Sequence, residues 1–214
     1  MRNQKLRPKY RKEGYLQSLR YWISLFQNRK EGNMATNDRF IGRDAEFKLF
    51  DRYFHTPDSQ LVVVYGRRRI GKSDFLKEYG KNKKKFYFEG LEKQRTKEQL
   101  LHFRVQLAEG LADQSINNVN FVNWNNAFQF LTARLTDNNP SQKKFIVFDE
   151  IQWMACGNDK LIALIKYYWD KYWKNQNIFL VLCGSVASFM INRVVRSNLH
   201  SAPEWCVNYR SYGV

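Results

Sequence analysis

An eight-residue segment constrains the fold of this chain more than any other feature. Residues 66–73 read Gly-Arg-Arg-Arg-Ile-Gly-Lys-Ser and match the phosphate-binding loop pattern G-x-x-x-x-G-K-[ST] at every defined position. The apolar, β-branched run 61–65 comes before this segment and predicts a buried strand. Residues 74–79 have helical spacing and stop at Gly80, a residue typical of helix ends. A strand, a glycine loop and a helix in this order are the context in which such a loop binds phosphate.

The chemistry of the loop predicts which atoms would hold a nucleotide. Glycines let the backbone wrap around an anion, while the amides and the helix N-terminus direct positive charge at it. Lys72 can then reach the β- and γ-phosphates, and the hydroxyl of Ser73 can take one coordination site of Mg²⁺. We therefore expect ATP or another nucleoside triphosphate to bind with Mg²⁺. The expected binding residues are Gly66, Arg67, Arg68, Arg69, Ile70, Gly71, Lys72, Ser73 and Asp74. The alternative interpretation is a glycine-rich turn before a structural helix.

A second motif places two carboxylates at the end of a predicted strand. The apolar run 145–148 is followed directly by Asp149 and Glu150. In open α/β sheets, ligands bind at the carboxyl ends of the strands. We expect Asp149 to hold Mg²⁺ through water, opposite Ser73, and Glu150 to orient or deprotonate the attacking water. The structural alternative is an ordinary strand that ends in solvated acids.

Composition and charge limit the classes of function. The 214 residues suffice for one sizeable α/β domain and some additional sequence, but not for two full domains. A formal net charge of +16 would suit an acidic partner such as nucleic acid or a membrane surface. Much of this excess lies in residues 1–33, in the arginines of the loop and in the lysines of 81–85. We therefore treat nucleic-acid binding as possible but not favoured.

Cysteine and histidine usage gives no indication of a metal site. The three cysteines are far apart without C-x-x-C spacing, and Cys183 is most simply a small buried residue. The three histidines are scattered. No apolar stretch approaches the roughly 20 residues needed to cross a bilayer, and the basic start lacks the apolar core of a secretory signal. No transmembrane segment is expected, and the predicted location is cytoplasmic.

Three regions differ in composition. Residues 1–36 form a basic N-terminal extension, residues 37–196 an orderly core, and residues 197–214 a tail without a clear pattern. A helix in the extension would gather on one face the apolar residues Leu16, Leu19, Ile23 and Phe26. This helix could contact a membrane or a partner, or pack on the core as an ordinary extension. The third interpretation is that the native product starts at Met34, in which case residues 1–33 should be removable without loss of folding or nucleotide affinity.

The core alternates predicted strands and helices. Strands are expected at 61–65, 86–88, 145–148 and 178–183, and helices at 47–54, 74–79, 97–111, 124–135 and 161–173. This alternation predicts an α/β fold in which a mostly parallel sheet lies between two layers of helices. The dense aromatic residues of 167–173 are expected to be core residues rather than a platform for stacking bases.

Four segments together carry a resemblance to a known family. They are 40–46, 65–73, 148–152 and 183–185, in this order. From about residue 40 to residue 196 the chain resembles the archaeal-type ATPases of prokaryotes, which are AAA-related P-loop NTPases of the STAND group. The resemblance implies a three-layer ATP-binding core with five parallel strands in the order 5-1-4-3-2. It also places segment 40–46 near the adenine or the base of the sheet.

The resemblance implies roles and also shows departures. Ser185 would be the sensor of the γ-phosphate, so that Lys72, Glu150 and Ser185 would form the catalytic set. Such proteins continue into a fifth strand, a helical lid and a C-terminal effector region, whereas 197–214 offers at most a short strand at 205–207. We therefore expect a truncated core that binds ATP with Mg²⁺ and hydrolyses it slowly or not at all, with a homo-oligomer or a protein effector as possible partner. The alternative is a basic nucleic-acid-binding or regulatory module that retains only nucleotide binding.

Overall fold

The computed structural model describes residues 43–136, 142–195 and 206–209, and every structural statement below concerns these residues. The chain divides after Leu49 into two units. Of the first unit, only 43–49 are described, and they include the start of helix α2 (Asp44–Phe54). The second unit contains all the other described residues and the whole sheet. The predictions on segments 1–36 and 40–42, and most of those on the tail, fall outside the described residues.

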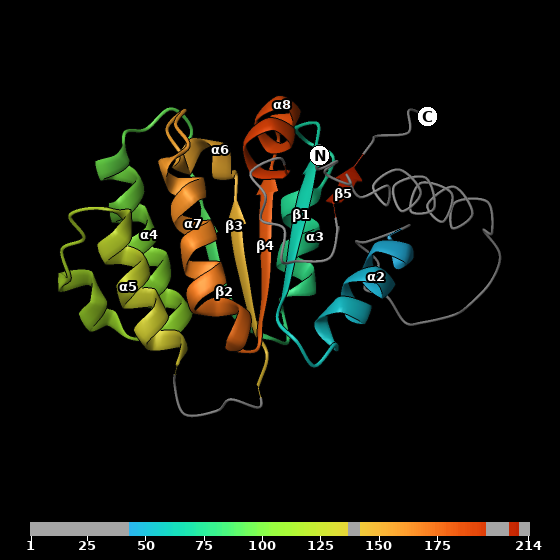
Figure 1. Cartoon of the computed structure of the whole chain (residues 1–214), viewed down its shortest axis with the longest axis horizontal. Coiled ribbons are helices and arrows are strands. Elements are labelled where there is room, and N and C mark those ends of the chain that lie inside the picture. The colour runs from blue at the N-terminus through green and yellow to red at the C-terminus, as the bar shows by residue number, and fades with distance from the viewer. Residues whose placement is uncertain (1–42, 137–141, 196–205, 210–214) are drawn as a thin grey trace, which may run out of the picture. The chain divides into compact units, whose positions relative to one another are not determined.

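The centre of the second unit is a parallel sheet. Its four longer strands are β1 (Gln60–Gly66), β2 (Lys84–Glu89), β3 (Lys144–Asp149) and β4 (Ile178–Gly184). They lie in the order β2-β3-β4-β1, so that β4 separates β1 from β3 (Figure 1). This order confirms the prediction for these four strands. A short strand, β5 (Cys206–Tyr209), pairs in parallel with β1 at its free edge.

Helices cover both faces of the sheet. On one face lie α4 (Thr96–Leu111), α5 (Trp124–Leu135) and α7 (Lys160–Lys171), which share one apolar core with alternate residues of the strands. The opposite face is covered by α3 (Lys72–Tyr79) and by Phe50 of α2, whose ring contacts Phe75 and Phe179. Because side chains alternate along a strand, β3 and β4 supply both cores and are buried throughout. The predicted three-layer α/β/α fold is confirmed.

Short elements connect these layers. They are the 3₁₀ helices η1 (Gln114–Asn118) and η2 (Trp173–Asn175), the short helices α6 (Ile151–Met154) and α8 (Ala187–Phe189), and the π-helix η3 (Met190–Val194). The asparagine-rich stretch supplies a helix start, because the side chain of Asn123 accepts a hydrogen bond from the backbone N–H of Asn126 at 3.0 Å. Within the described ranges, no helix combines the length and apolar character needed to cross a membrane.

The aromatic segment 167–173 is mainly core, as predicted, but it is not one continuous helix. Helix α7 ends at Lys171, and Tyr172 leaves the helical region with φ −127° and ψ −58°. This break turns the indole of Trp173 into the core, where it is fully buried and donates a hydrogen bond to Thr132 Oγ1 at 2.8 Å. Tyr168 and Trp169 are also buried, whereas Tyr167 is exposed.

Candidate active site

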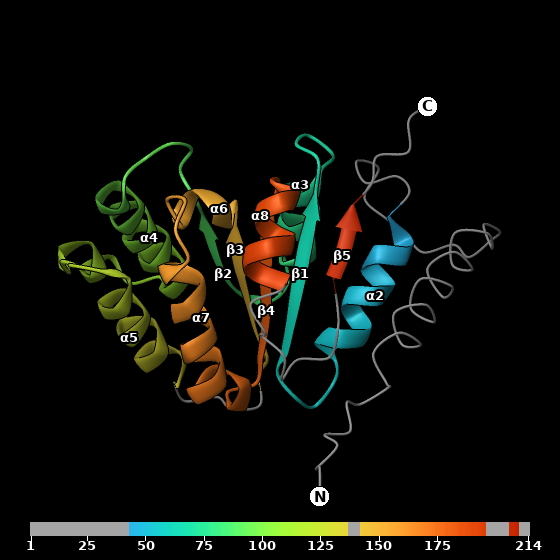
Figure 2. The same cartoon turned by 45° about the horizontal axis from the view of Figure 1, so that its top comes forward.

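The turn between β1 and α3 carries the predicted phosphate loop. It lies at the end of the sheet to which the strands point, as does α6 (Figure 2). Gly71 adopts φ 74° immediately before α3, a left-handed conformation that glycine takes without strain. Arg69 has φ 64°, which costs a residue with a side chain about 1–2 kcal/mol. The loop therefore stores some backbone strain at Arg69, between the end of β1 and the start of α3.

Lys72 lies inside this loop rather than in solvent. Its side chain is almost buried, with the residue only 4% exposed. The ammonium donates hydrogen bonds to the backbone carbonyls of Gly66 at 3.1 Å and Arg67 at 2.8 Å. Because an ammonium has three N–H donors, one of them is not engaged by any described residue. Lys72 thus stabilises the loop through two of its carbonyls and keeps a donor available for an anion.

Asp149 is fully buried at the end of β3. Its carboxylate accepts hydrogen bonds from the phenol of Tyr87 and from the backbone N–H of Glu150, the latter at 2.9 Å. Burial, followed by the charge of Asp149, raises the pKa of Tyr87 far above its usual range, so the phenol remains a donor at neutral pH. The same two causes raise the pKa of the neighbouring thiol of Cys183. Asp149 is therefore a buried carboxylate that is oriented by two neutral hydrogen-bond donors.

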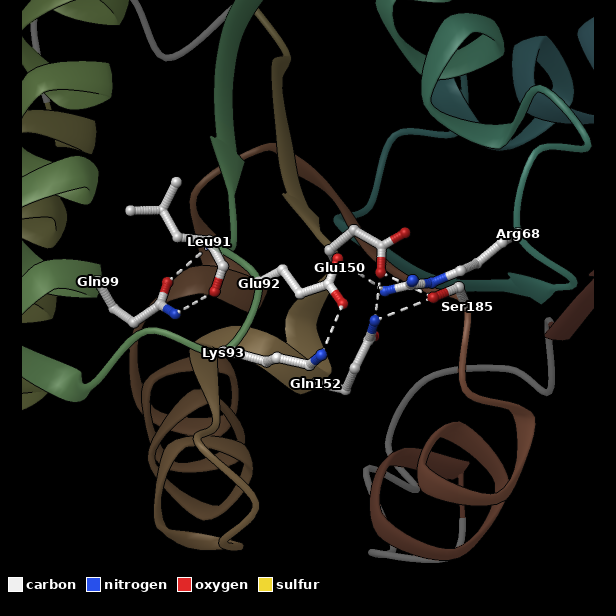
Figure 3. Close-up of polar contacts among 8 residues, drawn as sticks. All are labelled: Arg68, Leu91, Glu92, Lys93, Gln99, Glu150, Gln152 and Ser185. Atoms are coloured by element: carbon white, nitrogen blue, oxygen red, sulfur yellow. Dashed lines mark hydrogen bonds and ion pairs between the residues drawn. The ribbon is translucent and has the colours of Figure 1, made fainter.

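Glu150 follows in a left-handed conformation, with φ 49° and ψ 43°, and begins helix α6. Its carboxylate accepts a hydrogen bond from the hydroxyl of Ser185 at 2.8 Å. The side-chain amide of Gln152 also donates to Glu150 and, at 3.1 Å, to Ser185 Oγ (Figure 3). The sheet order thus brings Glu150 and Ser185, from the ends of β3 and β4, into direct contact.

The arginines of the loop are exposed, and the side chain of Arg68 is oriented by two contacts. Its guanidinium forms an ion pair with Glu92 at 3.3 Å and lies 5.5 Å from the centre of the Trp153 ring. An open cavity of about 550 Å³ lies beside this pair, and its lining includes Arg68, Glu92, Glu150 and Trp153. The cavity is continuous with the acidic end of β3, so a ligand on the phosphate loop would have space next to Glu150.

Two residues of the site were not predicted from the sequence, namely Tyr87 and Gln152. Tyr87 pairs with Val147 across β2 and β3, which places it on the same sheet face as Asp149, two residues further on. The alternation of side chains and the pairing of these two strands were expected, the pairing from the resemblance, but their register, which sets Tyr87 beside Asp149, was not. Gln152 lies within the segment that carries the resemblance, without a role assigned to it.

The predicted metal ligands are oxygen donors of the kind that Mg²⁺ prefers. Mg²⁺ usually keeps several waters and takes one or two protein ligands together with substrate phosphates. The Ser73 side chain forms no hydrogen bond to a described residue, and Asp149 already has two donors. This donor set fits an Mg²⁺ ion that is held largely through water. The described residues contain no cluster of three or more His, Cys, Asp or Glu side chains suited to a metal.

Comparison with known proteins identifies the family. The profile of an ATPase domain found predominantly in Archaea matches residues 40–210, which is most of the chain. The chain belongs to this family of ATPase domains. An uncharacterized protein of Methanocaldococcus jannaschii, MJECL04, is 25% identical over 156 residues, covering 73% of this chain and 32% of the relative. A second protein of the same organism, named an uncharacterized ATP-binding protein, MJ0423, is 36% identical over 45 residues, covering 21% of this chain and 76% of the relative.

Solved structures show the same fold as this archaeal-type P-loop ATPase domain. The Walker-type ATPase PABY2304 of Pyrococcus abyssi has a TM-score of 0.57 at 16% identity, over 86% of this chain and 58% of that one. Cdc6p of Pyrobaculum aerophilum has a TM-score of 0.56 at 14% identity, over 85% and 48%. The Drosophila ORC bound to DNA has a TM-score of 0.60 at 16% identity, over 82% and 44%. The chain thus spans about a third of MJECL04 and about half of these structures.

Proposed function

We propose that this ATPase domain binds ATP with Mg²⁺ through the loop of residues 66–73. The observation that carries the proposal is the position of Lys72, whose ammonium is enclosed by the loop it would share with the phosphates. An almost buried cation with one donor not engaged by a described residue, next to a helix N-terminus, suits a polyphosphate. Gly71 and Arg69, both at positive φ, hold the loop in the curvature that places this cation.

The proposed roles of the remaining residues follow from their contacts. Ser73 and Asp149 would hold Mg²⁺, Asp149 through water, and the ion when bound would neutralise charge on the phosphates. Glu150 would orient the attacking water, since its carboxylate is directed by donors from Ser185, after β4, and Gln152, in α6, and it lines the open cavity. Ser185 would exchange its bond to Glu150 for one to the γ-phosphate.

We propose that hydrolysis in this chain is slow or absent. An arginine that stabilises the transferred phosphoryl group contributes on the order of 10³ to 10⁵ in rate. Among the described residues after Ser185 the one arginine is Arg193, and it forms an ion pair with Asp159, the residue before α7. An arginine supplied by a second copy or by a protein effector would then raise the rate, which makes such an assembly the proposed regulator.

Titration calorimetry with Mg·ATP tests the binding proposal. The variant Lys72→Ala removes a charge-assisted hydrogen bond to phosphate, a contribution of about 1.5–3 kcal/mol, and should raise the Kd roughly 10- to 150-fold. The matched control is Lys81→Ala, which removes the same charge beyond the other end of α3, where Lys81 pairs with Glu78 at 2.6 Å. This control should bind ATP as the wild type does. Equal affinity in Lys72→Ala and the wild type would refute the assignment.

The net charge of +16 supports a second candidate, in which the domain binds nucleic acid. One structure of similar fold is described as ORC bound to DNA. The arginines at 67–69 are exposed, although the nucleotide would compete for them. Filter binding to DNA at two salt concentrations distinguishes the candidates, because affinity from phosphate contacts falls steeply with salt. Binding of DNA that survives in Lys72→Ala and disappears at higher salt would favour this second function.

A further inference from the structure

The acidic end of β3 contains a polar cluster that the proposed roles do not fully use. We call it the Glu150 clasp and define it as Glu150, Gln152 and Ser185. Gln152 is the buried member, with only 6% of the residue exposed. Its amide nitrogen donates to both of the others, and Ser185 in turn donates to Glu150 (Figure 3). The three side chains therefore form a closed triangle of hydrogen bonds.

The orientation of the Gln152 amide is determined by its neighbours. A carboxylate accepts hydrogen bonds only, so the NH₂ group and not the carbonyl oxygen must face Glu150. The carbonyl oxygen, Oε1, is buried and has no hydrogen-bond partner among the described residues. It lies over Gly184, where an added Cβ would be 2.6 Å from Oε1. The end of β4 thus has room for this amide because residue 184 has no side chain.

The two donors of the Glu150 clasp differ in whether they can stay with Glu150 when a nucleotide binds. The hydroxyl of Ser185 has one hydrogen, and that hydrogen is donated to Glu150. If Ser185 turns to a γ-phosphate, as its proposed role requires, Glu150 loses this donor. Gln152 is then the remaining donor to the carboxylate among the described side chains. Because Gln152 also donates to Ser185, a movement of the serine changes a hydrogen bond of the same amide.

We propose that Gln152 is the positioning residue for Glu150: it keeps the carboxylate directed at the attacking water when Ser185 changes its partner. This inference rests on the proposed function, since it assigns Gln152 a task within the same reaction. Gln152 does not contact the nucleotide in this proposal and acts through Glu150. Its loss should therefore lower the rate of hydrolysis without weakening the binding of ATP.

The first experiment needs no nucleotide. In ¹⁵N–¹H NMR spectra, the side-chain amide of Gln152 is assigned by its disappearance in Gln152→Met, a variant of similar length without a donor. We expect this signal to shift in Glu150→Gln and in Ser185→Ala, and to exchange slowly with solvent. A signal that does not respond to Glu150→Gln would overturn the proposal, whether or not ATP binds.

The second experiment tests the reaction under single-turnover conditions, with labelled ATP followed for a day so that slow hydrolysis is measured. The rate of hydrolysis by Gln152→Met should be lower than that of the wild type by a factor of up to about ten. Its Kd for ATP should stay within about twofold of the wild type. In a Glu150→Gln background, the same substitution should have no further effect, because the two residues act together. An unchanged rate in Gln152→Met, or an equal slowing in the Glu150→Gln background, would overturn the proposal.

A matched control separates positioning from general loss of packing. Gln99 is also a buried glutamine, but its amide bonds to backbone atoms and not to Glu150 or Ser185. Its partners are Leu91, at 2.9 Å and 2.7 Å, and the carbonyls of Trp153 at 3.2 Å and Gln94 at 3.4 Å. Gln99→Met should lower the melting temperature and leave the hydrolysis rate per folded molecule unchanged. The amide signal of Gln152 should also respond to a non-hydrolysable ATP analogue and not to ADP. If no nucleotide binds, the proposed function fails, while the response to Glu150→Gln still decides whether Gln152 holds the carboxylate.

Discussion

Gly90 provides a direct test of how closely the backbone is packed beneath Glu150. It follows β2, and its N–H donates to the carbonyl of Asp149 at 2.9 Å. An added Cβ at this position would lie 2.6 Å from the carbonyl oxygen of Glu150, 2.8 Å from Met154 Cγ and 3.0 Å from the Met154 nitrogen. The first and third of these atoms belong to the backbone, so a change of side-chain rotamer cannot relieve the contacts.

We expect Gly90→Ala to be clearly destabilising for this reason. Overpacking of a filled site costs about 1–3 kcal/mol, and contacts with backbone atoms place this variant at the upper end. In a domain of this size, about 1 kcal/mol corresponds to roughly 2–4 °C in melting temperature. The expected decrease is therefore roughly 6–12 °C, measured by thermal unfolding followed by circular dichroism.

The control is Gly110→Ala, the same substitution within helix α4. Here the nearest atom to the added Cβ is Phe86 Cδ1 at 3.1 Å, in a side chain, and the nearest backbone atom is the carbonyl oxygen of Lys85 at an ordinary 3.5 Å. Alanine also stabilises a helix by about 0.5–1 kcal/mol relative to glycine, so the net change should be small. If Gly90→Ala unfolds at the same temperature as Gly110→Ala, the close approach of Gly90 to the Glu150 backbone is refuted.

Two further outcomes are expected. Burial, and then the charge of Asp51, raise the pKa of the Tyr79 phenol above its usual value, so the folded state keeps a proton that the unfolded state loses near pH 10. The free energy of unfolding should therefore fall above pH 10 by up to about 1.4 kcal/mol per pH unit for this group. In urea titrations from pH 9 to 11, Tyr79→Phe should make this decrease with pH less steep. An unchanged slope in the variant would contradict the proposed role of Tyr79. For hydrolysis, steady-state phosphate release should stay below about 1 s⁻¹, and a faster turnover that Glu150→Gln abolishes would mean that the active site is already complete.

The secondary structure and the phosphate loop were predictable because their determinants are local. Strands β1 and β4 consist mainly of apolar runs, and helix α5 was predicted from the spacing of Trp124, Phe128, Leu131 and Leu135, with a stop at 137–140. The loop depends on residues adjacent in sequence, and its strand and helix follow it directly. One local prediction was inaccurate, since α7 ends before Trp173, whose indole reaches a buried partner on α5. That hydrogen bond spans 41 residues, and no local pattern contains it.

In the active site, too, local features were predictable from the sequence and contacts between distant residues were not. The sequence by itself determined that Lys72 belongs to a phosphate loop and that Asp149 and Glu150 end a buried strand. The resemblance implied the order of the four longer strands, but only the tertiary structure decided what these groups contact, because the register and the packing of side chains set which of them meet. Tyr87 meets Asp149 across 62 residues, and Glu150 meets Ser185 across 35. Alternation along a strand predicts the face on which a side chain lies, but the partner on that face is chosen by the packing of the whole sheet.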